Sequence, residues 1–418
     1  MANNNLATIR MVTFKVLDEF LNNLKVVSGF TTEFEGDFGR KGAKIGDTLY
    51  PRKPQRWLVK TGAAYQEQPI IDTIATITID RHRHIGFDYG AFESTLSLDD
   101  MYNRYFAKQT TQLANQVDDE ASQFAYLGTN NNTGTLGADP TTLATAQSLF
   151  LTAYAILMEN GCPTSDLTAV FSPRMAASIM QYLNTNFNPT GQIGQQFLRG
   201  ELMSNMFGFK RIAVDQNIWN HTAGTFVGTP LVNGASVDGD TSIVTDGWTS
   251  GDILNAGDTF TIASVNNVNP KNRRSTGIVK RFVVRTTQTA DSGGNMTIPL
   301  GGDFSLAGPG NQYQNVDALA ADNAALTVWN GTSSPSAKSG AQSLAFGPTA
   351  FAYCPITLPD VGEEGAFCSQ ATDPKTQTSM TMVRQVNAET YRRIARMDMG
   401  FGFGYLYPDA ESVRLIGA

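Results

Sequence analysis

The sequence predicts an α+β fold that carries a small inserted antiparallel β domain. Residues 40–100 have the pattern of a long, basic β-hairpin arm that leads directly into a long polar helix. From about residue 222 to 343, short alternating runs separated by Gly-, Asp-, Thr- and Ser-rich turns indicate a β-barrel or sandwich. An extended arm adds little to a compact core and needs a neighbour to lie against, so the pattern favours a self-assembling structural subunit.

The composition is typical of a large, weakly charged chain with several domains. Its 418 residues predict two or three domains, and its 39 glycines predict many turns. A net charge of -7 argues against a dedicated nucleic-acid binder, although the inner face of a shell could still be locally basic. No run approaches the ~18 apolar residues of a membrane span, and the first residues lack an apolar signal core. We therefore expect a protein made and used in the cytoplasm, without membrane contact.

Residues 8–27 predict an amphipathic helix, because apolar side chains recur there at helical spacing. These side chains are Ile9, Val12, Val16, Leu17, Phe20, Leu21 and Leu24. Two interpretations stay open at this point. The helix packs on its own body, or it is a terminal arm that binds a neighbour or an assembly partner.

Residues 46–60 and 70–88 alternate like the two strands of the arm, with Ala75 and Ile77 on one face and Thr76 and Thr78 on the other. Basic side chains outnumber acidic ones between residues 51 and 84. The basic ones are Arg52, Lys53, Arg56, Lys60, Arg81 and Arg83, against Glu67, Asp72 and Asp80. Since the whole chain is acidic, this arm fits an acidic surface on an identical copy. A solvated basic hairpin is the alternative.

Residues 97–127 form the strongest predicted helix. Ser97 and Asp100 have the spacing of a capping box, and Gly128 stands where a C-terminal glycine would end the helix. At 1.5 Å per residue the helix is roughly 45 Å long. Its polar middle favours a helix that lies across a sheet or a layer over one inside a core.

The following stretch alternates helix and strand patterns and is interpreted as one α/β domain. Helices are predicted at about 141–160, 173–183 and 195–207, and strands at 167–171 and 208–214. Within the inserted β region the clearest strands are 258–265, 278–285 and 295–300. Residues 379–416 return to strand and turn patterns.

No pattern of residues predicts a catalytic, cofactor or metal site. His82 and His84 share one face of a strand, but no third ligand is evident, and His221 stands alone. Cys162, Cys354 and Cys368 form no CxxC pair and are interpreted as small buried side chains. We therefore expect no catalytic residue, no cofactor, no metal and no enzymatic activity.

The ordered set of segments resembles the major capsid (coat) proteins of short-tailed phages, in the group similar to the Salmonella phage coat protein with an insertion domain. The segments are LDEFLNNLKVV, FGRKGAKIGDTLYPRKPQRW, TITIDRHRHIGFDY, TLSLDDMYNRYFAKQTTQLANQVD, GFKRIAVDQNI and GDTFTIASVNNVNPKNRRSTGIVKRFVV. Together they cover essentially the whole chain. The resemblance implies an HK-97-like phage capsid fold with a small antiparallel β-barrel domain inserted.

The resemblance also implies a division of the chain. Residues 1–33 would be the N-terminal arm, 34–96 the extended loop, 97–159 the spine helix and peripheral domain, 160–221 with 344–418 the axial domain, and 222–343 the inserted β-barrel domain.

The implied function is that of a virion shell. Hexamers and pentamers would close into an icosahedral procapsid around a scaffolding protein in the host cytoplasm. The shell would expand when double-stranded DNA enters through a portal protein. DNA would then meet the inner face without sequence specificity, and a decoration protein is allowed.

Two sets of contact residues follow. The candidate scaffold contacts are Leu17, Phe20, Leu21 and Leu24. The candidate inter-subunit contacts are Arg52, Lys53, Arg56, Lys60, Arg81, Arg83, Lys271, Arg273 and Arg274. Three other functions are weighed: an encapsulin-like compartment shell, a β-rich surface adhesin and, last, an enzyme. The insertion domain argues against the compartment shell, and the missing signal peptide argues against the adhesin. The lack of convergent catalytic residues argues against the enzyme.

Overall fold

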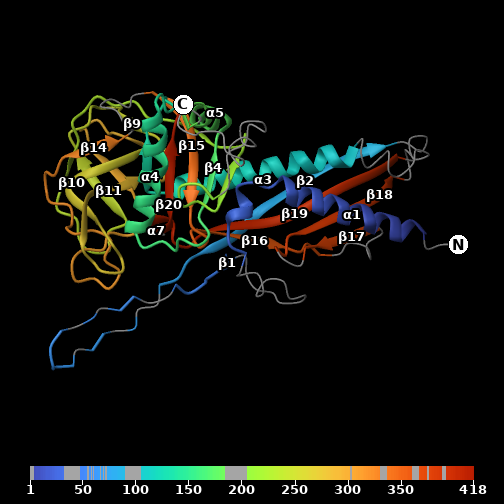
Figure 1. Ribbon diagram of the computed structural model, residues 1–418, viewed down its shortest axis with the longest axis horizontal. Coiled ribbons are helices and arrows are strands. Elements are labelled where there is room, and N and C mark those ends of the chain that lie inside the picture. Colours follow the sequence, from blue (N-terminus) through green and yellow to red (C-terminus); the bar gives the residue numbers. More distant parts are fainter. Residues whose placement is uncertain are drawn as a thin grey trace. The chain divides into compact units, whose positions relative to one another are not determined.

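The computed structural model describes residues 4–32, 48–53, 56–57, 59, 61–65, 67–68, 70, 73–89, 105–183, 205–301, 304–329, 337–359, 367–373, 376–387 and 392–418. They form a mixed α and β architecture (Figure 1). The chain divides into two compact units, each assembled from separate segments. The first is Met1–Pro51, Ala75–Ala121 and Phe351–Gly404, and the second is Arg52–Ile74, Ser122–Ala350 and Tyr405–Ala418.

The first unit is built on a sheet with strand order β1-β2-β19-β18-β17, in which β16 also pairs with β19. The strands are β1 Thr48–Leu49, β2 Ile77–Tyr89, β16 Phe351–Ile356, β17 Phe367–Thr372, β18 Ser379–Asn387 and β19 Arg392–Tyr405. The predicted alternation is confirmed where β2 begins, because Ala75 and Ile77 are buried and Thr76 is exposed. Strands distant in sequence lie side by side, as Figure 1 shows for the red β19 and the blue β2.

The predicted N-terminal helix is confirmed as α1 (Asn4–Asn23), which ends earlier than expected and is followed by the 3-10 turn η1 (Val27–Gly29). It packs against β17 and β18 of the first unit. The Thr13 hydroxyl donates to Ser369 Oγ at 3.1 Å. After the helix, the Asp118 carboxylate accepts hydrogen bonds from Lys25 N at 2.6 Å and Val27 N at 3.0 Å. These bonds hold the turn that ends α1.

The predicted spine helix is present as α3 (Ala107–Gly128), which ends at the expected glycine. Its predicted start at Ser97 lies outside the described residues. One face of α3 is fully buried, as expected for a helix that lies across a sheet or a layer. Ala114, Val117 and Ala121 have no exposed surface. The small alanines on this face let the helix lie close to its neighbours.

The second unit contains a sheet with strand order β3-β20-β15-β4-β5, in which β6 also pairs with β15. The strands are β3 Asn131–Gly134, β4 Thr168–Phe171, β5 Arg211–Val214, β6 Asn220–Thr222, β15 Ser339–Phe346 and β20 Ser412–Ile416. The helices are α4 Leu143–Glu159, α5 Pro173–Leu183 and the short α7 Pro408–Glu411. These bounds confirm the predicted helices at 141–160 and 173–183. Of the helix predicted at 195–207, residues 195–204 lie outside the described residues and 205–207 form a turn.

The inserted β region has its own apolar core within the second unit. Its strands are β7 Leu231–Val232, β8 Ser242–Asp246, β9 Ile253–Leu254, β10 Thr259–Val268, β11 Ser275–Val283, β12 Gln288–Thr289, β13 Met296–Pro299 and β14 Leu326–Trp329. They form three small sheets, β11-β10-β14, β12-β9 and β13-β8-β7, in which all pairs are antiparallel. Trp248, Phe260 and Phe282 lie in the core that the three sheets share.

Candidate functional site

The arm is extended and exposes large apolar side chains. Among its described residues between 52 and 74, the pairing is a single bridge between Arg52 and Ile74, with a hydrogen bond from Lys53 N to Thr73 O at 2.7 Å. Within the described residues of the arm, the strand pairing of the predicted hairpin is seen at its base. Its exposed apolar side chains include Trp57 at 58%, Val59 at 93%, Tyr65 at 88% and Ile70 at 74%. Such a row of exposed apolar groups marks a surface that another molecule covers.

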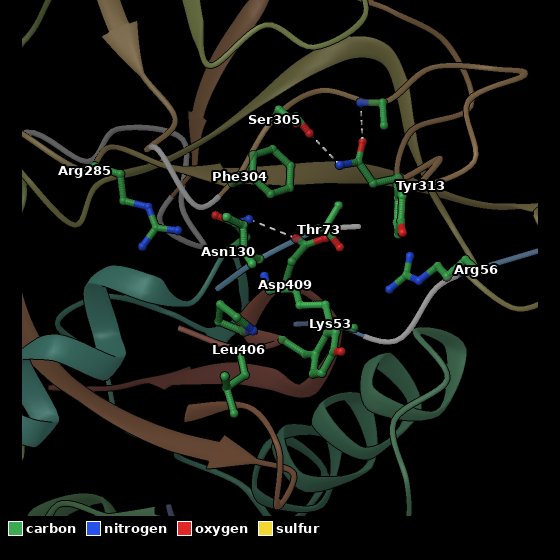
Figure 2. Close-up of a pocket in the computed structure, with 16 residues that line it drawn as sticks. Lys53, Arg56, Thr73, Asn130, Arg285, Phe304, Ser305, Tyr313, Leu406 and Asp409 are labelled. Carbon is green, nitrogen blue, oxygen red and sulfur yellow. Dashed lines mark hydrogen bonds between the residues drawn. The ribbon is translucent and has the colours of Figure 1, made fainter. Parts of the chain in front are cut away.

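At the base of the arm, the second unit contains a cavity of about 370 Å³ (Figure 2). Its walls come from the arm, the turn after α3, the inserted β region and the segment around α7. The lining residues that carry chemistry are Lys53, Arg56, Asn130, Arg285, Tyr407 and Asp409. We call this space the arm-base cavity.

An ion pair between a buried lysine and a half-buried aspartate holds one wall of the arm-base cavity. Lys280 of β11 is 1% exposed, and its Nζ donates to Asp409 Oδ1 at 2.7 Å and Oδ2 at 2.8 Å. Asn130 Nδ2 donates to the same carboxylate at 2.9 Å. Burial raises the pKa of Asp409, but the Lys280 charge and these hydrogen bonds outweigh burial, so the pKa lies below its usual range. Asp409 is therefore an engaged, ionised carboxylate.

Two basic side chains that line the cavity, Arg285 and Lys53, contact a carbonyl or aromatic rings. Arg285 Nε donates to Leu300 O at 3.2 Å, and its guanidinium lies 5.1 Å from the centre of the Tyr405 ring. Lys53 Nζ lies 5.6 Å from the centre of the Tyr407 ring. The Tyr407 hydroxyl is buried and has no hydrogen-bond partner among the described residues. Burial raises its pKa.

The structure places two predicted contact residues of the arm against their own unit. Arg83 Nε donates to Glu120 Oε1 at 2.6 Å, and Arg81 Nη1 lies 3.5 Å from Glu120 Oε2. Both arginines thus already pair with a carboxylate of α3. Arg52 is exposed, whereas Lys53 and Arg56 are half-buried. Lys60 lies outside the described residues.

Of the predicted contact residues on the inserted region, Arg273 and Lys271 lie against other parts of the second unit, and Arg274 is exposed. Arg273 donates to the carbonyls of Asn311 at 3.0 Å and Gln312 at 2.8 Å. Lys271 lies over Gly161 at the C-terminal end of α4, where a lysine complements the helix dipole. Arg274 is exposed on the same turn.

The candidate scaffold contacts are mostly core residues in this conformation. Leu17, Phe20 and Leu24 are buried, and Leu21 is half-buried. A scaffold contact through the buried three stays a prediction, and it would require α1 to leave its place on β17 and β18.

The histidines and cysteines hold positions that fit structural roles. His82 Nε2 lies 2.8 Å from Asp398 Oδ1, a carboxylate that Arg396 also contacts. No group of three or more His, Cys, Asp or Glu in the described part of the chain could hold a metal ion. Cys162 and Cys354 are buried and Cys368 is half-buried. Burial, with the Glu411 charge, raises the pKa of Cys162 to about 12. In the same described residues, no helix is long and apolar enough to span a membrane.

Sequence reasoning missed Asn130, Arg285, Tyr407 and Asp409 as parts of one site. Asn130 and Asp409 are 279 residues apart, and no local motif connects them. A useful signal was the single lysine near the middle of an otherwise strand-like run, Ile278 to Arg285, which can be buried only with an anion beside it.

Comparisons with known proteins agree on one class. No curated protein sequence shows significant similarity to the chain. Three similar solved structures are those of Mycobacterium phage Che8, the capsid of cyanophage P-SCSP1u and the CUS-3 coat protein I-domain. The first has 12% identity, 94% and 90% coverage of this chain and of that chain, and a TM-score of 0.43. The second has 13% identity, 92% and 88% coverage, and a TM-score of 0.41. The third has 28% identity, 24% and 96% coverage, and a TM-score of 0.19.

Because all three TM-scores are low, the assignment rests on the family model of the P22 coat protein (gene protein 5), which matches residues 61–417. That family consists of structural capsid proteins and not of enzymes. The chain therefore belongs to the P22 coat protein family and is a major capsid protein of a phage shell, with an HK97-like fold.

Proposed function

We propose that copies of this chain form hexamers and pentamers that close into an icosahedral shell around double-stranded DNA, and that the arm supplies a main contact between copies. The observation that carries this role is the row of exposed apolar side chains on the arm, from Trp57 to Ile70. Covering each of them on a neighbour would contribute roughly 1.5–3 kcal/mol before the costs of association. Many contacts of this size, repeated around a closed shell, suffice for stable assembly.

The finer parts of the function belong to the same proposal. Assembly in the host cytoplasm would use a scaffolding protein, a portal protein would admit the DNA, and DNA would contact the inner face without sequence specificity. The exposed Arg52 and Arg274 are the predicted basic contacts best placed to meet a neighbour. The five-part division inferred from the resemblance also stays a proposal. The encapsulin-like and adhesin alternatives are not favoured, because the matching family is one of phage coat proteins.

Deletion of residues 52–68 tests the role of the arm. We expect a folded, soluble subunit that forms no closed shells in negative-stain electron microscopy, alone or with a candidate scaffolding protein. Intact particles from the deletion variant would refute the role. A finer comparison is Val59→Ser on the arm against Val227→Ser in the inserted region, since the two valines are 93% and 85% exposed. Only the first substitution should lower the yield of shells.

A further inference from the structure

Arg414 lies in the interior of the second unit with part of its guanidinium group left without a hydrogen bond. It belongs to β20, and its side chain is 1% exposed. Nη1 donates to Gly257 O at 2.8 Å and to Gln342 Oε1 at 3.5 Å. Nε and Nη2 are buried and have no hydrogen-bond partner among the described residues. Burial lowers the pKa of Arg414 to about 10, so the group stays charged at neutral pH, and its unpaired donors are costly unless an acceptor meets them.

A small cavity lies beside this side chain, between the sheet of the second unit and the inserted region. The sheet contributes His221, Gln342 and Arg414 to its walls, and the inserted region contributes Asp258 and Thr259. We call it the Arg414 cavity. Its volume is about 10 Å³, and every residue that lines it is buried. A space of this size has room for one water molecule.

An acceptor that matches these donors belongs to Asn132 of β3. Strands β3 and β20 are parallel, and Asn132 is the register partner of Arg414, so the two side chains share one face of the sheet. Asn132 has no exposed surface, and its Nδ2 donates to Thr259 Oγ1, in the wall of the cavity, at 2.7 Å. Its Oδ1 is buried and has no hydrogen-bond partner among the described residues. Unpaired donors and an unpaired acceptor are therefore neighbours at this cavity.

The Arg414 cavity needs a ligand that both accepts and donates hydrogen bonds. The Asp258 carboxylate in its wall is already engaged, because Oδ1 lies 2.9 Å from His221 Nε2 and Oδ2 accepts two backbone N–H groups at 2.7 and 2.9 Å. It supplies Arg414 with an opposite charge nearby and leaves Nε and Nη2 unpaired. A chloride ion could accept from Arg414, but it has no proton to donate to Asn132 Oδ1. Water can do both.

We propose that the Arg414 cavity binds one water molecule, which accepts a hydrogen bond from the Arg414 guanidinium and donates one to Asn132 Oδ1. Its second hydrogen is available to Gln342 Oε1, whose hydrogen bond from Arg414 is long at 3.5 Å. Three hydrogen bonds are typical of an internal water. The water holds the guanidinium against Gly257 O and so connects β3 and β20 to the turn before β10 of the inserted region. This binding is a property of one subunit and does not depend on the shell.

A crystal structure of the full-length chain, at a resolution that shows ordered waters, tests the proposal directly. We expect a density peak at about 2.7–3.2 Å from Asn132 Oδ1 and from Nε or Nη2 of Arg414. The crystals are grown in sodium bromide, because bromide scatters anomalously and marks the positions of bound anions. Absence of the peak would overturn the proposal. An anomalous signal at the peak would also overturn it, because the ligand would then be an anion.

Oxygen-17 magnetic relaxation dispersion of the solvent counts long-lived internal waters in the unassembled subunit. Arg414→Met deletes the donors and Asn132→Leu deletes the acceptor, so each should lower the count by one. Arg274→Met is the control, because Arg274 is an exposed arginine of the same unit, and it should keep the count unchanged. Circular dichroism shows whether each variant is folded. An unchanged count in a folded Arg414→Met variant would overturn the proposal, and the structure of the unchanged chain decides it if neither variant folds.

Discussion

Removing the Lys280 charge should increase local unfolding of the inserted region beside the arm-base cavity. Lys280→Met keeps most of the apolar length of the side chain but deletes the ammonium group, which donates to Asn267 Oδ1 at 3.1 Å and to both Asp409 oxygens. The Asp409 carboxylate then still accepts the hydrogen bond from Asn130 Nδ2. Because the Asp409 side chain is 26% exposed, removing its partner should cost about 3 kcal/mol, the low end of the range for buried pairs. Asp409→Asn in addition should recover part of this loss, because it removes the uncompensated charge.

Hydrogen exchange of the unassembled subunit measures this effect. A loss of about 3 kcal/mol corresponds to roughly a hundredfold faster exchange along β11, where protection reflects local opening. Arg274→Met, on the exposed turn before β11, should leave the exchange unchanged. If Lys280→Met accelerates exchange less than about threefold, the pair does not hold this region and the reasoning is wrong.

The same pair predicts a dependence on pH with a defined sign. The folded-state pKa of Asp409 lies below the ordinary value of an aspartate carboxyl group. Its contribution is therefore fully present above the ordinary pKa of a carboxyl group and is lost as the pH falls through the depressed value. The unchanged chain should lose protection along β11 below about pH 4. Lys280→Met should lack this part of the acid response.

Three further predictions concern other parts of the second unit. Burial raises the pKa of Glu411, so its ionised form destabilises the fold, and the melting temperature should rise as the pH falls from 7 towards 5. In Glu411→Gln the melting temperature should change less over this pH range. If the variant keeps the same dependence of melting temperature on pH, Glu411 is not the responsible group. Cys162, with its pKa of about 12, should react with maleimide at pH 8 more slowly than the half-buried Cys368. Peptide mass spectrometry shows which cysteine is labelled first. Early labelling of Cys162 would mean that its site opens. Thr142→Ala removes the N-cap of α4 and should cost about 1 kcal/mol in urea unfolding, whereas the exposed Thr141→Ala should cost almost nothing; equal effects would exclude a capping role.

Local patterns in the sequence predicted the elements well where one signal dominates. Pro173 begins α5, Gly128 ends α3, and alternation around Ile77 identifies the buried face of β2. Each of these effects acts within a few residues of the chain. The buried face of α3 also contains alanines, and alanine is a weak hydrophobic signal in a sequence.

The candidate site was less predictable, because its residues meet only through tertiary folding. The arm was recognised as basic and exposed, and its apolar side chains are indeed uncovered in one copy. The pairing of Arg83 with Glu120 could not be predicted, since it depends on how β2 is placed beside α3. Arg414 shows the same limit. It is 1% exposed in the central strand β20, and it donates to Gly257 O at 2.8 Å, which no alternation pattern would indicate.

The order of strands in both sheets has a consequence for synthesis on the ribosome. β19 lies between β2 and β18, and β20 lies between β3 and β15. In the second unit, the hydroxyls of Thr129 and Ser412 are hydrogen-bonded although they are 283 residues apart. The sheet of the first unit therefore cannot be completed until translation has passed residue 405, and that of the second unit until it has passed residue 416. A chain that stops before residue 392 lacks an inner strand in both sheets. Such a truncated copy therefore cannot form the folded subunit that assembly requires.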